Sequence, residues 1–423
     1  MSNTHVCPNC STAGMESFFK ADGVPVHSVQ LLRTRQEALD FPKGNIDLAF
    51  CRACGFISNV AFDPQLHDYS HEYESTQQYS PTFSNFHRQL AESLVERYNL
   101  HNKDLVEIGC GQGEFLALLC ETGGNKGIGF DPAFVAGRNP TVNGTDIKVI
   151  NDYYSEKYTD TRGDFYCCKM TLEHISTTRE FVGTVRRAIG DRPEAIVFFQ
   201  VPDVRKILRD LGFWDIYYEH CSYFSAPSLA RLFQACGFNV LDLKTEYDDQ
   251  YLMIEARPTN GVGGPLPAEG MDLEGISRDV AYFAENWRAK FEGWRQKLHR
   301  MKAQGRRTVI WGGGSKGVAF LTMLGIKDEV AYAVDINPLK HGTFMAGTGQ
   351  EVVAPEFLRD YRPDAVIVMN SIYCREIGEQ LESLGVTAEL LTADQSREHE
   401  TTAIGAVSPE EPQVSSSVES RIR

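Results

Sequence analysis

Two histidines and their neighbours are the residues of this sequence best suited to moving protons. His220 lies in the segment YYEHCSYFS, with Tyr217 and Glu219 beside it, and His174 lies in MTLEHI. A histidine changes charge near neutral pH, so it can take a proton from a substrate or return one. A lone histidine is more often structural, and YYEH could equally be a packed loop before an apolar helix. The choice depends on whether the fold brings the two histidines together.

A glycine-rich segment, VEIGCGQGEF, predicts a binding loop for a nucleoside. It places Glu107, Gly109, Gly111 and Gly113 between an expected strand and an expected helix. The next expected strand ends at Asp131, about twenty residues on, where an acid can accept hydrogen bonds from both ribose hydroxyls. The spacing does not suit a dinucleotide. A dinucleotide-binding loop reads GxGxxG, whereas this loop reads GxGxG and lacks the last glycine of that motif, which lets a helix pack under a pyrophosphate. Glycines that only form a tight turn are the alternative.

Two CxxC pairs predict a metal site near the N-terminus. Cys7 and Cys10 form one pair, and Cys51 and Cys54 form the other. Each pair places two thiolates on one turn, and two such turns can complete a tetrahedral shell of four sulfur ligands around Zn²⁺. This shell leaves no open position, so the expected role of the zinc is structural. Unrelated surface thiols or a redox pair would be the alternative.

A second glycine-rich turn predicts a phosphate site in the C-terminal part. The segment VIWGGGSKGVAF places Ser315 and Lys316 where a strand is expected to turn into a helix. Free backbone N–H groups and the positive end of a helix suit a phosphate. Asp335 follows the next expected strand, and Asn370 ends the one after it. The alternatives are a degenerate Rossmann-like unit that only packs, and an NAD site.

A parallel sheet is needed to bring these residues together. Between residues 80 and 260, helix-like segments alternate with apolar runs, which read DLVEIGCG, GIGFD, KVIND, DFYCCKM and AIVFFQVP. Strands alternating with helices predict an α/β fold with a parallel sheet. Ligands of such sheets bind at the carboxyl ends of the strands, where we expect Asp131, His174 and His220.

The remaining segments divide the chain into parts. Residues 1–68 are the predicted zinc-binding domain and residues 69–257 the first α/β unit. Residues 258–305 are predicted to hold a linker (Gly- and Pro-rich at 258–268) and a docking helix, because one apolar stripe recurs every three or four positions. The stripe consists of Ile276, Val280, Phe283, Trp287, Phe291, Trp294, Leu298 and Met301. A second α/β unit at 306–394 and a polar, disordered tail at 395–423 complete the prediction.

Composition excludes several classes of function. The chain has 423 residues and a formal net charge of −15. Nucleic acid is therefore not expected as a partner, because its phosphates are bound by clustered Lys and Arg. No apolar run approaches the ~18 residues of a membrane helix, and the N-terminus shows no signal peptide. We expect a cytoplasmic protein that acts on a small molecule.

The first glycine loop resembles the first motif of class I S-adenosylmethionine-dependent methyltransferases. In those enzymes the loop passes close under the methionine part of the cofactor. The resemblance implies that Asp131 binds the ribose. It also implies that Asp152 and Tyr153, in the segment INDYY, flank the adenine.

The order of parts resembles the sugar C-methyltransferases. These join an N-terminal zinc domain, a class I methyltransferase domain and a C-terminal Rossmann-like domain, and the resemblance extends to about residue 394. In that family a motif like YxEHxxxFS supplies a histidine base with a tyrosine and a glutamate beside it, which Tyr217, Glu219 and His220 match. His174 matches the histidine of a TLxHI segment. Tyr73 is the best match to a tyrosine that covers the cofactor.

This resemblance implies a reaction. A carbon beside a ketone becomes a nucleophile only after it loses a proton, which His220 would take while Glu219 orients the imidazole. Tyr217 and His174 would donate hydrogen bonds to the developing enolate oxygen.

The substrate implied is a keto-deoxysugar linked to a nucleoside diphosphate, which the C-terminal unit would hold through Ser315, Lys316 and Asn370. Two alternatives remain open. One is O- or C-methylation of another small metabolite, and the other is a non-catalytic scaffold that binds protein partners.

Overall fold

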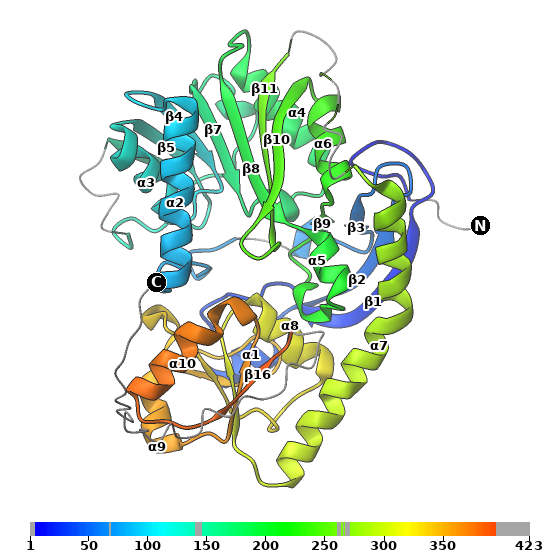
Figure 1. Ribbon diagram of the computed structural model, residues 1–423, viewed down its shortest axis with the longest axis vertical. Coiled ribbons are helices and arrows are strands. Elements are labelled where there is room, and N and C mark those ends of the chain that lie inside the picture. Colours follow the sequence, from blue (N-terminus) through cyan, green and yellow to red (C-terminus); the bar gives the residue numbers. More distant parts are fainter. Residues whose placement is uncertain are drawn as a thin grey trace, which may run out of the picture.

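The structure is a computed structural model and contains two α/β units and an N-terminal sheet. Figure 1 shows one unit above the other, with the N-terminal strands at one side and the long helix α7 (Leu273–Ala303) running past both. The predicted tail at 395–423, and most of the predicted linker at 258–268, lie outside the described residues. The structure describes residues 5–66, 69–139, 146–259, 264, 266 and 271–394.

The first α/β unit contains a seven-stranded sheet in the order β10-β11-β8-β7-β4-β5-β6. The five predicted strands are confirmed as parallel neighbours: β4 (Asp104–Ile108), β5 (Lys126–Phe130), β6 (Ile147–Ile150), β7 (Phe165–Lys169) and β8 (Ile196–Pro202). The sheet continues beyond β8 with an antiparallel hairpin that the sequence analysis did not predict, β10 (Phe238–Glu246) and β11 (Tyr251–Pro258).

Helices cover both faces of this sheet, because side chains of the central strands alternate between two apolar clusters. Phe165 and Cys167 of β7 face one cluster, and Tyr166 and Cys168 face the other. The first cluster is covered by α2 (Pro81–Tyr98) and α3 (Glu114–Gly123), and the second by α4 (Thr178–Ile189) and α6 (Ala226–Ala235). Cys167 and Cys168 are therefore core residues.

The N-terminal sheet includes a strand that belongs to the first α/β unit in sequence. Its order is β1-β2-β3-β9. The strands are β1 (Glu16–Pro25), β2 (Lys43–Phe50), β3 (Ile57–Asn59) and β9 (Ser222–Tyr223), and α1 (Arg35–Leu39) lies between β1 and β2. Since β9 follows His220 closely, its antiparallel pairing with β3 fixes the segment that carries this histidine.

The four cysteines of the two CxxC pairs lie together. The sulfur of Cys7 is 3.7 Å from that of Cys54, and the sulfur of Cys10 is 3.6 Å from that of Cys51. All four sulfur atoms lie within 4.8 Å of one another. Gly55 follows the second pair with a φ of +81°, a conformation that favours glycine. The cluster packs in the same apolar core as α6, so it joins the N-terminal segment to the first α/β unit.

The second α/β unit contains a five-stranded parallel sheet in the order β14-β13-β12-β15-β16. The three expected strands are β12 (Thr308–Trp311), β13 (Tyr332–Val334) and β15 (Ala365–Val368), and β16 (Glu389–Thr392) follows them in the chain. The short edge strand β14 (Glu351–Val353) was not predicted. The helices of this unit are α8 (Ser315–Leu324), α9 (Leu358–Tyr361) and α10 (Cys374–Ser383).

Helix α7 connects the parts along its whole length. The expected apolar stripe is present, and Asp272 caps the helix by accepting a hydrogen bond from the N–H group of Gly275. Apolar residues at 276–283 pack against the N-terminal sheet and α5 (Val204–Arg209), and those at 294–301 pack against the second α/β unit. Neither α7 nor any other described helix is long and apolar enough to cross a membrane.

Candidate active site

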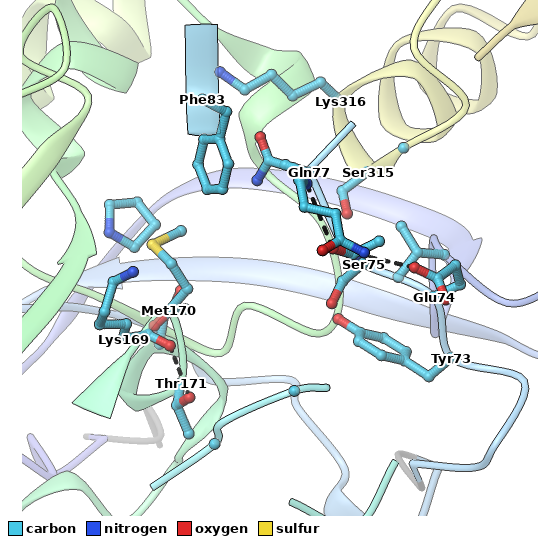
Figure 2. Close-up of a pocket in the computed structure, with 18 of the residues that line it drawn as sticks. Tyr73, Glu74, Ser75, Gln77, Phe83, Lys169, Met170, Thr171, Ser315 and Lys316 are labelled. Atoms are coloured by element: carbon cyan, nitrogen blue, oxygen red, sulfur yellow. Dashed lines mark hydrogen bonds between the residues drawn. The ribbon is translucent and has the colours of Figure 1, made fainter. Parts of the chain in front are cut away.

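A cavity of about 680 Å³ is lined by residues of both α/β units. Figure 2 shows Lys169, Met170 and Thr171, from the end of β7, on one side of it. Ser315 and Lys316, from the start of α8, lie on another side, with Tyr73 and Glu74 close to them. The cavity thus lies where the carboxyl ends of the parallel strands of the first unit face the glycine-rich turn of the second.

The glycine loop after β4 turns tightly. Gly109, Gly111 and Gly113 have φ values of +69°, +57° and +80°. A Cβ atom at Gly109 would lie 1.9 Å from the hydroxyl oxygen of Thr171, so only glycine allows this approach to the end of β7. The loop residues Gly109 and Gly111 line the cavity.

Asp131 at the end of β5 is held by this loop. Its Oδ2 accepts a hydrogen bond of 2.8 Å from the N–H group of Gly111, and its Oδ1 accepts one of 2.8 Å from that of Ala133. Burial raises the pKa of Asp131 to about 6. Each carboxylate oxygen keeps acceptor capacity for a ribose hydroxyl. The backbone of the loop and the carboxylate of Asp131 therefore fit the nucleoside part of S-adenosylmethionine.

The second unit repeats this arrangement. Oδ2 of Asp335 accepts a hydrogen bond of 2.8 Å from the N–H group of Gly313, and Oδ1 accepts one of 2.8 Å from that of Asn337. The difference is Lys340, whose Nζ lies 3.3 Å from Oδ2 of Asp335. The side chains of Asp335, Asn337 and Lys340 line the same cavity as the turn before α8.

A segment at residues 69–80 contacts both α/β units and the N-terminal sheet. Glu74 is almost fully buried and accepts hydrogen bonds from Arg138 at 3.1 Å and from Asn337 at 3.2 Å. The Tyr73 hydroxyl donates to Glu219 at 3.3 Å. The ring of Tyr69 lies 5.9 Å from that of His174. This segment, which we name the cover segment, therefore lies over the site that the histidines form.

The fold brings His174 and His220 together, as expected from their places after two strands of the sheet. The rings of His174 and His220 are 4.7 Å apart and nearly perpendicular, and the ring of Tyr217 is 4.2 Å from that of His220. His174 ends a short 3₁₀ turn after β7, and His220 precedes β9. All three line the cavity. An imidazole pair with a phenol beside it can take a proton and stabilise a developing oxyanion.

Glu173 also belongs to this cluster, although the sequence predicted no role for it. One carboxyl oxygen of Glu173 and one ring nitrogen from each histidine lie within 4.8 Å of one another, a spacing that would also admit a metal ion. Glu173 is 1% exposed, and neither of its oxygens has a hydrogen-bond partner among the described residues. Burial raises its pKa to about 8, so the carboxyl group holds its proton at neutral pH. The only sequence signal was its place next to His174.

Glu219, which we expect to orient the imidazole of His220, also contacts the N-terminal segment and the cover segment. The Glu219 carboxylate accepts hydrogen bonds from the N–H and hydroxyl groups of Ser28, from the Tyr73 hydroxyl, and from His27 at 3.4 Å. Glu219 does not line the cavity. Its side chain therefore holds the segment that follows β1 and the cover segment against the segment that carries His220.

The other predicted residues fall into two groups. Tyr153 lines the cavity, whereas Asp152 does not: its carboxylate accepts hydrogen bonds from Tyr158 at 2.6 Å and from Lys157 at 2.9 Å.

The predicted substrate residues Ser315, Lys316 and Asn370 all line the cavity. Two of them also have partners in the first unit. Lys316 forms an ion pair with Asp215 at 2.9 Å, and Asn370 donates a hydrogen bond of 2.6 Å to Gln250. These contacts join the two units across the cavity.

Both α/β units match models of known protein families. A family model described as a methyltransferase domain matches residues 83–243, and one described as a C-methyltransferase C-terminal domain matches residues 272–389. The C-methyltransferase NovU of Streptomyces niveus is 26% identical over 353 residues, which is 78% of this chain and 81% of NovU.

Two solved structures are similar to part of the chain. The 1,6-didemethyltoxoflavin-N1-methyltransferase of Burkholderia thailandensis is 15% identical, with 44% of this chain and 92% of that chain covered and a TM-score of 0.33. The PH0226 protein of Pyrococcus horikoshii is 14% identical, with 44% and 96% covered and a TM-score of 0.35.

The proton on Glu173 generates a prediction about stability. The folded protein holds this proton up to pH 8 or so, whereas an ordinary glutamate loses it near 4.5. The free energy of unfolding should therefore fall as the pH rises between these values. Glu173→Gln should reduce that fall by about 1–4 kcal/mol, measured by chemical denaturation at pH 5 and pH 9. The exposed Glu285, changed to Gln, is the control. Equal pH dependence of wild type and Glu173→Gln would contradict the prediction.

Proposed function

Because this chain belongs to the S-adenosylmethionine-dependent C-methyltransferase family, we propose that it methylates a carbon atom of a keto-deoxysugar linked to a nucleoside diphosphate. One observation carries the proposal. A single cavity is lined by the nucleoside-type loop of the first unit, by the histidine pair, and by the glycine-rich turn of the second unit. A substrate with a reactive carbon at one end and a diphosphate at the other fits such a cavity.

The cofactor would be held by the first unit. Asp131 would accept the ribose hydroxyls, the backbone of Gly109 and Gly111 would lie along the methionine part, and Tyr153 would contact the adenine. Tyr73 would cover the site from the cover segment. Bound S-adenosylmethionine supplies the methyl group as an electrophile.

His220 would act as the general base. It would take the proton from the carbon beside the ketone, leaving the electron pair as an enolate. Tyr217 and His174 would donate hydrogen bonds to the enolate oxygen, where the negative charge develops. Glu173 is the carboxyl group of the same cluster, and a charged imidazole beside it would favour its ionised form. The proton would stay on His220 until it is released to water.

The second unit would hold the diphosphate. Ser315 and Lys316 begin α8, so backbone N–H groups and the positive end of this helix face the cavity. Lys316 would exchange its partner Asp215 for a phosphate oxygen, and Asn370 would donate through its amide. Since both residues already have partners in the protein, methylation of a small metabolite without a diphosphate is the second candidate.

We further propose that the four cysteines bind one structural Zn²⁺. The sulfur atoms are free thiols and lie close enough to share one ion. Four thiolates from two turns give the closed tetrahedral shell of structural zinc sites. The ion would stabilise the contact between the N-terminal segment and α6.

A thermal-shift panel tests the substrate class. With S-adenosylhomocysteine present throughout, TDP, UDP, GDP and CDP are compared with no nucleotide. One diphosphate should raise the melting temperature by about 2 °C or more, because a ligand of the folded state stabilises it. Lys316→Met should abolish this shift, and Lys327→Met, which lies outside the cavity, should keep it. No shift with any diphosphate, beside a clear shift from S-adenosylhomocysteine alone, would favour the second candidate.

The role of His220 is tested with the keto-sugar of the nucleotide selected by that panel. His220→Gln should lower turnover by about 10²–10⁴-fold, the usual contribution of a general base. The variant should bind S-adenosylhomocysteine as the wild type does. Wild-type enzyme with S-adenosylhomocysteine in D₂O should exchange the proton beside the ketone, and the variant should not. Normal turnover or normal exchange in His220→Gln would exclude it as the base.

Metal analysis tests the zinc site. The purified protein should contain about one Zn²⁺ per chain, and Cys51→Ser should lose it and melt about 5 °C or more below the wild type. Cys236→Ser changes a lone cysteine outside the cluster and should affect neither quantity. A wild-type protein without zinc, whose melting temperature is insensitive to a chelator, would contradict the proposal.

A further inference from the structure

Lys169 is a buried cation at the end of β7 that neither the family comparison nor the proposed reaction uses. It is 8% exposed and lines the cavity. Its Nζ lies 2.8 Å from Nε2 of His87 and 3.7 Å from the centroid of the Phe115 ring. Within the described part of the chain it forms no ion pair. Taking an ammonium group out of water without a counter-charge is costly, so such a group is suited to an anionic ligand.

The neighbours of Lys169 hold it in place without neutralising it. Burial, together with the charge of Lys169, keeps the pKa of His87 well below its usual range, so the imidazole is neutral and accepts the hydrogen bond. Burial lowers the pKa of Lys169 itself to about 8, which leaves the ammonium form predominant at neutral pH. Figure 2 shows the Lys169 side chain beside Met170, on the side of the cavity away from Ser315.

A buried acid lies next to this cation. Glu107 of β4 pairs with Cys167 of β7, so Lys169, two positions further along β7, points to the same face of the sheet. Glu107 is 2% exposed, and its Oε2 has no hydrogen-bond partner in the described ranges. The two side chains line the same cavity but form no ion pair with each other. A buried ammonium group without a counter-charge, beside a carboxyl oxygen without a partner, suits the carboxylate and the ammonium of one amino acid.

We propose that Lys169 binds the carboxylate of the methionine part of S-adenosylmethionine, with His87 as its positioning residue. The place fits, because Gly109, which is expected to pass close under the methionine part, lies against Thr171, two residues beyond Lys169. Glu107 would then bind the ammonium group of the same methionine part. The inference depends on the cofactor and not on the sugar, so the two proposals fail independently.

The test compares two ligands that differ only in the carboxylate. One is S-adenosylhomocysteine, and the other is S-adenosyl-3-thiopropylamine, which keeps the amine and lacks the carboxylate. Wild-type protein should bind S-adenosylhomocysteine about 10- to 100-fold more tightly by calorimetry, the range of a charge-assisted hydrogen bond in a buried site. In Lys169→Met, affinity for S-adenosylhomocysteine should fall by that factor, and affinity for the amine should change by less than about threefold.

Controls separate recognition from folding. Lys206→Met changes another lysine that lines the cavity, which pairs with Asp210, and should leave both affinities unchanged. Equal loss of both ligands in Lys169→Met would overturn the proposal, since a structural role predicts that result. Unchanged S-adenosylhomocysteine affinity would also overturn it and assign Lys169 to the substrate instead. If Lys169→Met does not fold, the wild type alone decides: equal affinity for the two ligands excludes carboxylate recognition.

Discussion

A carboxylate that is almost fully buried holds three parts of the chain together at the active site. Burial alone would raise the pKa of Glu219, but the hydrogen bonds from His27 and Ser28 and the nearby charge of His174 outweigh it and bring the pKa to about 2. A buried charge is stable only when donors surround it, and these donors come from the segment that follows β1 and from the cover segment. The position of the neighbouring His220 therefore depends on residues that are far from it in the sequence.

Position in the sheet explains what could be predicted from sequence. Asp131 and His174 each follow an apolar run long enough to be a buried strand, and strand ends of a parallel sheet meet in one crevice. The partners of Glu219 could not be predicted, because Ser28 is 191 positions away and only tertiary packing brings it there. Strand β10 was missed because it lies at the sheet edge and is mostly half-exposed. Strand β11 was missed because charged residues interrupt its apolar run, although Glu255 is buried and paired with Arg97.

The same backbone arrangement occurs in both α/β units with different electrostatics. Each places an aspartate after the second strand of the unit, held by two backbone N–H groups. The carboxylate of Asp131 has no cation beside it among the described residues, so it remains an acceptor for neutral hydroxyls. The carboxylate of Asp335 is neutralised by Lys340, so it does not oppose the positive end of α8. The same arrangement of loop and aspartate thus presents an acceptor for hydroxyl groups in the first unit. In the second unit it presents a surface on which an anion meets less repulsion.

Helix α7 also sets a length scale. It is a single helix of 31 residues, which at 1.5 Å per residue spans about 46 Å, and its two halves are packed into different parts of the protein. A continuous hydrogen-bonded helix resists compression, so the separation of the two α/β units is fixed by backbone geometry before any ligand arrives. For the proposed substrate, this fixed separation would favour molecules of one length between the reactive carbon and the diphosphate.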